Sequence, residues 1–156
     1  MTTPAVEVRQ ATVAELDLLV PLFDAYRQFY RQPSEPEGVK RFLLERFAHS
    51  QSVIFISFDG TAVTGFTQLY PSFSSGAIAR IFILNDLFVA PEARGRGAGS
   101  ALLHAAAEYA RRVGAVRLVL STEVTNLTAQ SLYERRGWRR DTTFCAYQLA
   151  LGEPHL

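Results

Sequence analysis

The sequence predicts a mixed α/β fold in which helices cover both faces of a mixed sheet. Runs rich in β-branched and aromatic residues alternate along the chain with amphipathic segments of helical spacing. A glycine-rich turn joins one long apolar run to an alanine-rich helix. The chain has 156 residues, of which 48% are hydrophobic and 20% are charged, so a single domain over residues 1–156 can bury a substantial core.

The first third of the chain is expected to hold one strand and two helices. Residues 6–9 alternate apolar and polar side chains, as in a short strand. Thr12 is expected to cap the first helix, with Glu15 three residues later completing a capping box. Apolar residues follow at helical spacing, and Pro21 is expected to kink or split this helix. The next two segments are a loop over residues 31–38 and a second amphipathic helix over residues 39–48.

Five strands and two helices are expected in the remainder. Asp59-Gly60 is a strong hairpin signal, and Gly65 is compatible with a bulge in the strand that follows. Asn126 is expected to cap the last helix, and glycines are expected to end both helices. The expected strands are residues 53–58, 62–70, 77–89, 116–121 and 143–151, the Ser-rich loop is residues 71–76, and the helices are residues 100–113 and 126–136.

The composition argues against several classes of protein. A net charge of +1 gives no basis for a nucleic-acid or membrane surface. The sequence has no run of about 18 apolar residues and no signal-peptide pattern at its N-terminus, so neither a membrane span nor a leader is expected. One cysteine, Cys145, excludes an intramolecular disulfide and indicates the cytoplasm; it is expected to be a small core residue. The three histidines form no cluster, so no metal is expected.

Residues 85–99 are the stretch with the clearest chemical meaning. An apolar strand end is stopped by Pro91, and an alternation of Gly95, Gly97 and Gly99 leads directly into a helix. The N–H groups at a helix start have no partners within the helix and carry partial positive charge. Glycines let an anion approach that backbone, so a phosphate or diphosphate is the natural ligand. The Walker and dinucleotide spacings do not fit, and a tight turn with surface arginines is the alternative.

Two segments resemble those of the GNAT superfamily of N-acetyltransferases. The first is R-x-x-G-x-G at Arg94, Gly97 and Gly99, which follows the strand D-L-F-V and resembles the acyl-coenzyme A loop. The second runs from Asn126 to Trp138 and resembles the family segment N-x-x-A-x-x-x-Y-x-x-x-G-[FW]. The motifs are most similar to those of the spermidine/spermine (diamine/thialysine) branch, whereas the first third of the chain matches only in its helical pattern.

The resemblance implies a fold and a binding mode for acetyl-coenzyme A. The expected sheet is mixed and mostly antiparallel, and it splays between its fourth and fifth strands, where the cofactor enters. The diphosphate is expected on the loop amides, the pantetheine arm along the strand end like an added strand, and the thioester carbonyl near an N–H of Leu87 or Phe88. The cofactor-binding residues implied are Leu87, Phe88, Val89, Arg94, Gly95, Arg96, Gly97, Ala98, Gly99, Ser100 and Asn126.

The resemblance also implies catalytic roles. Tyr133 occupies the family's general-acid position and would protonate the departing thiolate. Asn126 lies seven residues earlier, so both residues share one helix face. The branch often places a glutamate where this chain has Asn85, and an amide cannot act as a base. Asp86 is therefore the candidate general base, with a role in fixing the strand end as the alternative, and Glu123 is a second candidate.

The acceptor amine is expected between the first two helices and the sheet. The candidate substrate-binding residues are Tyr26, Tyr30, Asn85 and Glu123. The sequence thus predicts an acetyl-coenzyme A-dependent N-acetyltransferase in which the primary amine of a small molecule, amino-acid-like or polyamine-like, attacks the thioester directly. Alternatives are a protein or peptide N-acetyltransferase and a non-catalytic acyl-coenzyme A-binding module. A homodimer formed through the last strands is expected, and neither nucleic acid nor membrane is expected as a partner.

Overall fold

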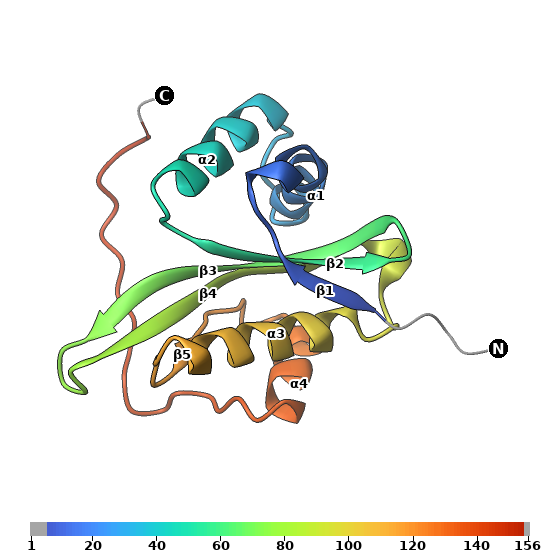
Figure 1. Cartoon of the computed structure of the whole chain (residues 1–156). Helices are drawn as coiled ribbons and strands as arrows, with labels where there is room; N and C mark the ends of the chain where they lie inside the picture. The colour runs from blue at the N-terminus through green and yellow to red at the C-terminus, as the bar shows by residue number, and fades with distance from the viewer. Residues whose placement is uncertain (1–5, 155–156) are drawn as a thin grey trace. The chain divides into compact units, whose positions relative to one another are not determined.

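A computed structural model describes residues 6–154 (Figure 1), and the chain divides after Ser121 into two compact units. The first unit contains a five-stranded sheet in the order β1-β2-β3-β4-β5. The first three pairings are antiparallel and the pairing of β4 with β5 is parallel, which confirms a mixed, mostly antiparallel sheet. The strands are β1 (Glu7–Gln10), β2 (Val53–Asp59), β3 (Ala62–Ser74), β4 (Ala79–Val89) and β5 (Leu118–Val119).

The third strand is longer than the sequence suggested. It continues through Pro71 to Ser74, where a Ser-rich loop was expected, so that expectation was wrong. Pro71 lies opposite Phe82 of β4, but the pairing of β2 with β3 stops at Leu69. Beyond Leu69 the β2 side of β3 is an edge, and a proline there removes no hydrogen bond between β2 and β3.

Helices cover both faces of this sheet (Figure 1). Helices α1 (Leu16–Phe29) and α2 (Pro36–Ala48) lie on one face, and α3 (Ala98–Arg112) lies on the other. The capping box of Thr12 and Glu15 is confirmed, within a 3-10 turn (Val13–Glu15) that precedes α1.

Two prolines occupy different positions in the helices α1 and α2. Pro21 lies inside an unbroken α1, so the expected split was wrong. A proline inside a helix costs about 3 kcal/mol. Burying each of Leu19, Leu22 and Phe23 against the sheet returns about 1.5–3 kcal/mol, so packing outweighs the lost hydrogen bond. Pro36 stands at the start of α2, where its missing N–H is harmless, and the loop is therefore shorter than residues 31–38.

An extra residue in β4 changes which face its side chains meet. Gln68 lies opposite Asp86, whereas Leu69 lies opposite Leu84, so Asn85 is a bulge. Before the bulge, the Phe82 ring lies 5.6 Å from the Tyr109 ring of α3. After it, the Phe88 ring lies 6.0 Å from Tyr26 of α1. In a regular strand all even-numbered residues would share one face, so the bulge turns Asp86 and Phe88 toward α1.

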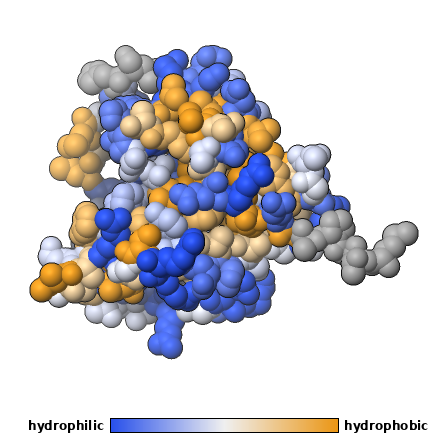
Figure 2. Space-filling model, viewed as in Figure 1, coloured by the Kyte–Doolittle hydropathy of each residue, from blue (hydrophilic) through white to orange (hydrophobic). Residues whose placement is uncertain are grey.

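The second unit contains α4 (Leu127–Arg135) and the C-terminal segment. The Asn126 side chain accepts a hydrogen bond from Ala129 N–H at 3.2 Å, which confirms the expected cap. The expected strand over residues 143–151 was wrong, because no described strand pairs with that segment. Its apolar side chains are exposed, as hydrophobic atoms along it in Figure 2 show. Cys145 is exposed as well, so its expected place in the core was wrong.

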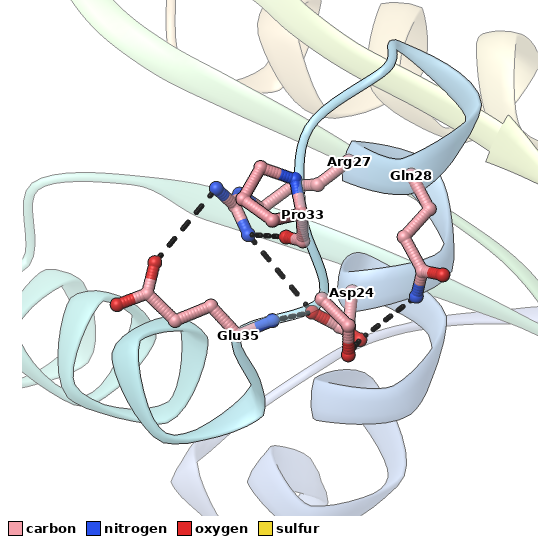
Figure 3. Close-up of polar contacts among 6 residues, drawn as sticks. Asp24, Arg27, Gln28, Pro33 and Glu35 are labelled. Carbon is pink, nitrogen blue, oxygen red and sulfur yellow. Dashed lines mark hydrogen bonds and ion pairs between the residues drawn. The ribbon is translucent and has the colours of Figure 1, made fainter.

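The loop between α1 and α2 is held by a buried carboxylate (Figure 3). Asp24 accepts hydrogen bonds from the Ser34 hydroxyl at 2.7 Å, from Glu35 N–H at 2.7 Å and from the Gln28 amide at 3.0 Å. Arg27 lies 4.0 Å from the same carboxylate. Burial raises the pKa of Asp24, but these hydrogen bonds and the charge of Arg27 outweigh burial and hold the pKa below its usual value.

Asp24→Asn should lower the free energy of unfolding at neutral pH by about 1–3 kcal/mol, because buried donors lose a charged acceptor. The folded pKa is depressed, so this stability is present above the unfolded pKa and is lost as pH falls through the folded pKa. Urea unfolding across pH should show the difference from wild type shrinking in acid. Asp17→Asn, at a side chain 86% exposed, is the control and should change little. Equal stability of wild type and Asp24→Asn at neutral pH would contradict this account.

Candidate active site

A buried carboxylate lies at the end of β4. Asp86 is 5% exposed and faces α1 because of the bulge. Gln68 Nε2 donates to Oδ2 at 2.8 Å, Asn85 Nδ2 donates to Oδ1 at 3.1 Å, and the Tyr26 hydroxyl donates as well. Burial raises the pKa of Asp86, and these hydrogen bonds from neutral groups offset only part of that rise. Asp86 is therefore a stronger base than an ordinary aspartate.

The backbone around Asp86 is fixed from the neighbouring strand. The Thr67 hydroxyl donates to the Asp86 carbonyl at 2.8 Å. Gly65 approaches β4 so closely that a Cβ there would lie 2.7 Å from the Phe88 carbonyl oxygen. The bulge expected near Gly65 is present beside it, where the pairing shifts between Ser57 and Phe58. Only glycine allows this approach of β3 to the strand end.

Two of the expected substrate-binding residues contact this carboxylate, and a third lies beside one of them. Tyr26 and Asn85 both contact Asp86, and the Tyr26 ring lies 5.1 Å from the Tyr30 ring. Glu123 belongs to the second unit, where its backbone carbonyl accepts a hydrogen bond from Asn126 N–H at 3.0 Å. A role for the Glu123 side chain stays a prediction.

Three polar residues around this site were not expected from the sequence: Gln68, Tyr70 and Arg46. Burial and the charge of Asp86 raise the pKa of Tyr70 to about 12, whereas the charge of Arg46 lowers it, so Tyr70 lies within electrostatic range of both charges. Gln68 and Tyr70 are two residues apart on β3, and this spacing could have placed them on one face. Arg46 on α2 gave no such signal.

The loop after β4 presents backbone donors to solvent. A 3-10 turn (Pro91–Ala93) is followed by Gly95 and Gly97, with φ of +80° and +87°. A Cβ at either glycine would meet nothing within 4 Å. Gly97 caps α3 without a side-chain hydrogen bond, and the first N–H groups of a helix carry partial positive charge. The loop therefore combines a positive helix N-terminus with room for an anion at Gly95 and Gly97.

The two loop arginines hold the loop in place. Arg94 Nε donates to the Val89 carbonyl at 2.9 Å, and its guanidinium lies 5.4 Å from the Phe29 ring centre and 5.7 Å from that of Phe88. Arg96 pairs with Asp59 at the end of β2 at 3.3 Å. Both guanidinium groups thus have partners in the protein, and the backbone is what the loop offers to a ligand.

One edge of β4 becomes free toward the loop. Among the described strands, β5 pairs with β4 only at Phe82 and Ile83. Leu87 and Val89 pair with β3 on their other side. The separation of the parallel pair β4 and β5 at this point matches the expected splay and leaves an edge to which an extended ligand can add. The bulge itself lies at Asn85, two residues before the Leu87 position near which the carbonyl-binding N–H was expected.

The second unit contains the expected general acid. Tyr133 lies on α4, and its ring centre is 6.0 Å from that of Trp138. Gly137, with φ of +91°, follows the end of α4, as expected. Over residues 6–154, no group of three or more His, Cys, Asp or Glu side chains could hold a metal ion, and no helix is long and apolar enough to cross a membrane.

The chain is similar to known acetyltransferases. Residues 19–138 match the model described as the Acetyltransferase (GNAT) family. An uncharacterized N-acetyltransferase, YhfO, of Bacillus subtilis is 49% identical over 91% of this chain and 95% of its own length. A crystal structure of a probable acetyltransferase has a TM-score of 0.90 at 43% identity, covering 95% of this chain and 99% of that one. Streptothricin acetyltransferase of Streptomyces lavendulae is 35% identical over 67% of this chain and 50% of its own length.

Asp86→Asn should leave the free energy of unfolding unchanged or raise it at neutral pH, because burying an ionised carboxylate is unfavourable. The folded pKa is raised, so the contribution of Asp86 to stability is full below the unfolded pKa and is lost as pH rises through the folded pKa. Wild type should therefore weaken relative to the variant with rising pH. Gln68 can turn its amide and accept a hydrogen bond from the new side chain.

Urea unfolding of both proteins across pH measures this difference, and carbon NMR of the Asp86 carboxyl reports its pKa directly. A loss of stability at neutral pH, comparable to that expected for Asp24→Asn, would show that the charge of Asp86 supports the fold.

Proposed function

The chain belongs to the GNAT family of acetyltransferases, and we propose that its acceptor is the primary amine of a small molecule. It is an N-acetyltransferase, and its family uses acetyl-coenzyme A as co-substrate. The observation that supports the proposal most is that one strand, β4, ends in a buried carboxylate and leads directly into a glycine-rich loop and the N-terminus of α3. A base for the amine and a cradle for a diphosphate would thereby come from one continuous segment, residues 86–100.

The proposed cofactor site uses this strand end and loop. The diphosphate binds the amides between Arg94 and Ser100, where the glycines leave room for it. The pantetheine arm adds along the free edge at Leu87 and Val89 and reaches Asn126. An N–H near Leu87 or Phe88 polarises the thioester carbonyl; in other acyl-transfer sites such a donor contributes about 2.7–4 kcal/mol.

The proposed chemistry is direct transfer. An alkylammonium has a pKa near 10.4, so the acceptor must lose a proton before it attacks. Asp86, with its raised pKa, takes that proton. The neutral nitrogen then bonds to the thioester carbon, the carbon–sulfur bond breaks, and the Tyr133 hydroxyl gives its proton to the thiolate. The nitrogen loses its extra proton as the amide forms, and a proton taken up through solvent restores the Tyr133 hydroxyl.

The class of acceptor is inferred from a relative of this chain. Similarity to a streptothricin acetyltransferase favours a small molecule. A protein N-terminus or lysine is the second candidate acceptor, and a non-catalytic acyl-coenzyme A-binding role is the third reading. An amine panel assayed for release of free thiol from acetyl-coenzyme A separates the three, because a binding module has no turnover.

We also propose a cytoplasmic homodimer. The exposed apolar side chains of the C-terminal segment would be covered by a second copy, which fits the expected pairing through this part of the chain. The single cysteine fits a reducing compartment. The exposed side chains concerned are Phe144, Tyr147, Leu149 and Leu151.

Gly97→Ala should weaken acetyl-coenzyme A binding about tenfold or more, because a methyl group would occupy the diphosphate site. Gly114→Ala is the matched control, since Gly114 has φ of +83° and equally open space at the other end of α3. Both variants should lose about 1–2 kcal/mol of stability, because alanine is strained at positive φ. Titration calorimetry measures the affinities, and equal affinity of both variants would remove the loop from the binding site.

Tyr133→Phe should lower kcat about 10²–10⁴-fold while the Kd for acetyl-coenzyme A stays within about twofold, because only the proton donor is lost. Thiol release and calorimetry give the two numbers. Tyr147→Phe, at a side chain 93% exposed in the same unit, is the control and should leave both unchanged. Full activity of Tyr133→Phe would assign the proton to another donor.

A further inference from the structure

A buried hydrogen-bond acceptor beside Asp86 has no partner in the described part of the chain. Gln68 is fully buried, and its Nε2 donates to Asp86, but its Oε1 accepts no hydrogen bond. Leaving a buried acceptor without a hydrogen bond costs about 1–3 kcal/mol, so Gln68 Oε1 is a position where a ligand donor would be favourable. An N–H of a bound acceptor amine would satisfy Oε1 at the same place where Asp86 takes the proton.

A buried donor of the opposite kind lies on α2. Arg46 Nε is buried and donates no hydrogen bond within residues 6–154. The guanidinium lies 4.4 Å from the Phe42 ring centre, and Nη2 pairs at 3.1 Å with Glu45, a side chain 61% exposed. Nε and one Nη form the fork that binds a carboxylate through two hydrogen bonds. An exposed ion pair contributes about 0–1 kcal/mol, so replacing Glu45 with a ligand carboxylate as the partner of Arg46 costs little free energy.

Tyr70 lies within electrostatic range of both Asp86 and Arg46. Strand alternation places Phe66, Gln68 and Tyr70 on one face of β3, and Phe66 stacks on Phe23 of α1 at 5.3 Å. The half-buried Tyr70 hydroxyl senses the charges of both Asp86 and Arg46. On its α1–α2 face, the sheet therefore has oxygen atoms at Asp86 and Gln68 that can accept hydrogen bonds from an amine, and the Tyr70 phenol lies on the same face. Arg46 of α2 can donate hydrogen bonds to a carboxylate.

We propose that the acceptor is an amino acid or a close relative, held by its carboxylate at Arg46 and by its amine at Gln68 and Asp86. This inference rests on the proposed function and names its substrate class. A polyamine would bring a second cation toward Arg46, and like charges in a partly buried site repel. Arg46 and Tyr70 thus select among amines, whereas Asp86 acts on all of them.

The test compares each amino acid with the amine that it becomes on loss of its carboxylate, such as lysine with cadaverine and ornithine with putrescine. Wild type should show a kcat/KM at least about tenfold higher for the amino acid of each pair, which is the ratio expected of one charge-assisted contact. Arg46→Gln should abolish this preference by raising KM for the amino acids, and it should raise rather than lower kcat/KM for the decarboxylated amines, because their second cation no longer meets a like charge. Arg46→Lys, which keeps the charge but not the fork, should restore part of the preference.

Arg41→Gln, at an exposed position of the same helix, is the control and should leave the ratio unchanged. Calorimetry with acetyl-coenzyme A shows that each variant is folded. A wild-type preference for the decarboxylated amines, or an equal loss on both members of each pair in Arg46→Gln, would overturn this inference while leaving the proposed function intact. Acetylation of no amine in either set would overturn both.

Discussion

The site depends on one extra residue in β4. Without the bulge at Asn85, Asp86 and Phe88 would share a face with Phe82 and would point toward α3. The bulge instead places the carboxylate against α1, and the Thr67 hydroxyl holds the Asp86 carbonyl from the neighbouring strand. The same strand then runs directly into the loop and α3. The even-numbered residues before and after the bulge therefore pack on opposite faces of the sheet, and the end of the strand carries the candidate base.

Two buried aspartates show how this chain divides stability and function. Asp24 is surrounded by donors that outweigh its burial, so its charge stabilises the link between α1 and α2. Asp86 is held by hydrogen bonds that do not outweigh its burial, so its charged form is disfavoured and its pKa rises. Asp24 belongs to the scaffold. Asp86 has a pKa raised by burial, and such perturbed groups are common in active sites.

Local chemistry explains which parts of the fold followed from sequence. The capping box at Thr12, the cap at Asn126 and the glycines of the loop are determined by neighbours within a few residues, and all were expected. The unbroken α1 and the long β3 depend on packing and on where β2 stops pairing. The segment over residues 143–151 has strand-like composition but no described partner strand, and a strand is defined by its partner.

The sequence by itself determined the fold class, the family and the loop, because glycine spacing and helix caps act locally and the motif residues lie close together in the chain. It also pointed to Asp86 as the candidate base. Only the tertiary structure decided that Gln68 bonds to Asp86, that Tyr70 lies within range of the charges of Asp86 and Arg46, and that a bulge turns Asp86 toward α1. These residues come from α2 and from two strands. Burial and hydrogen bonds between distant segments arise only when the chain folds, so the order of residues does not reveal them.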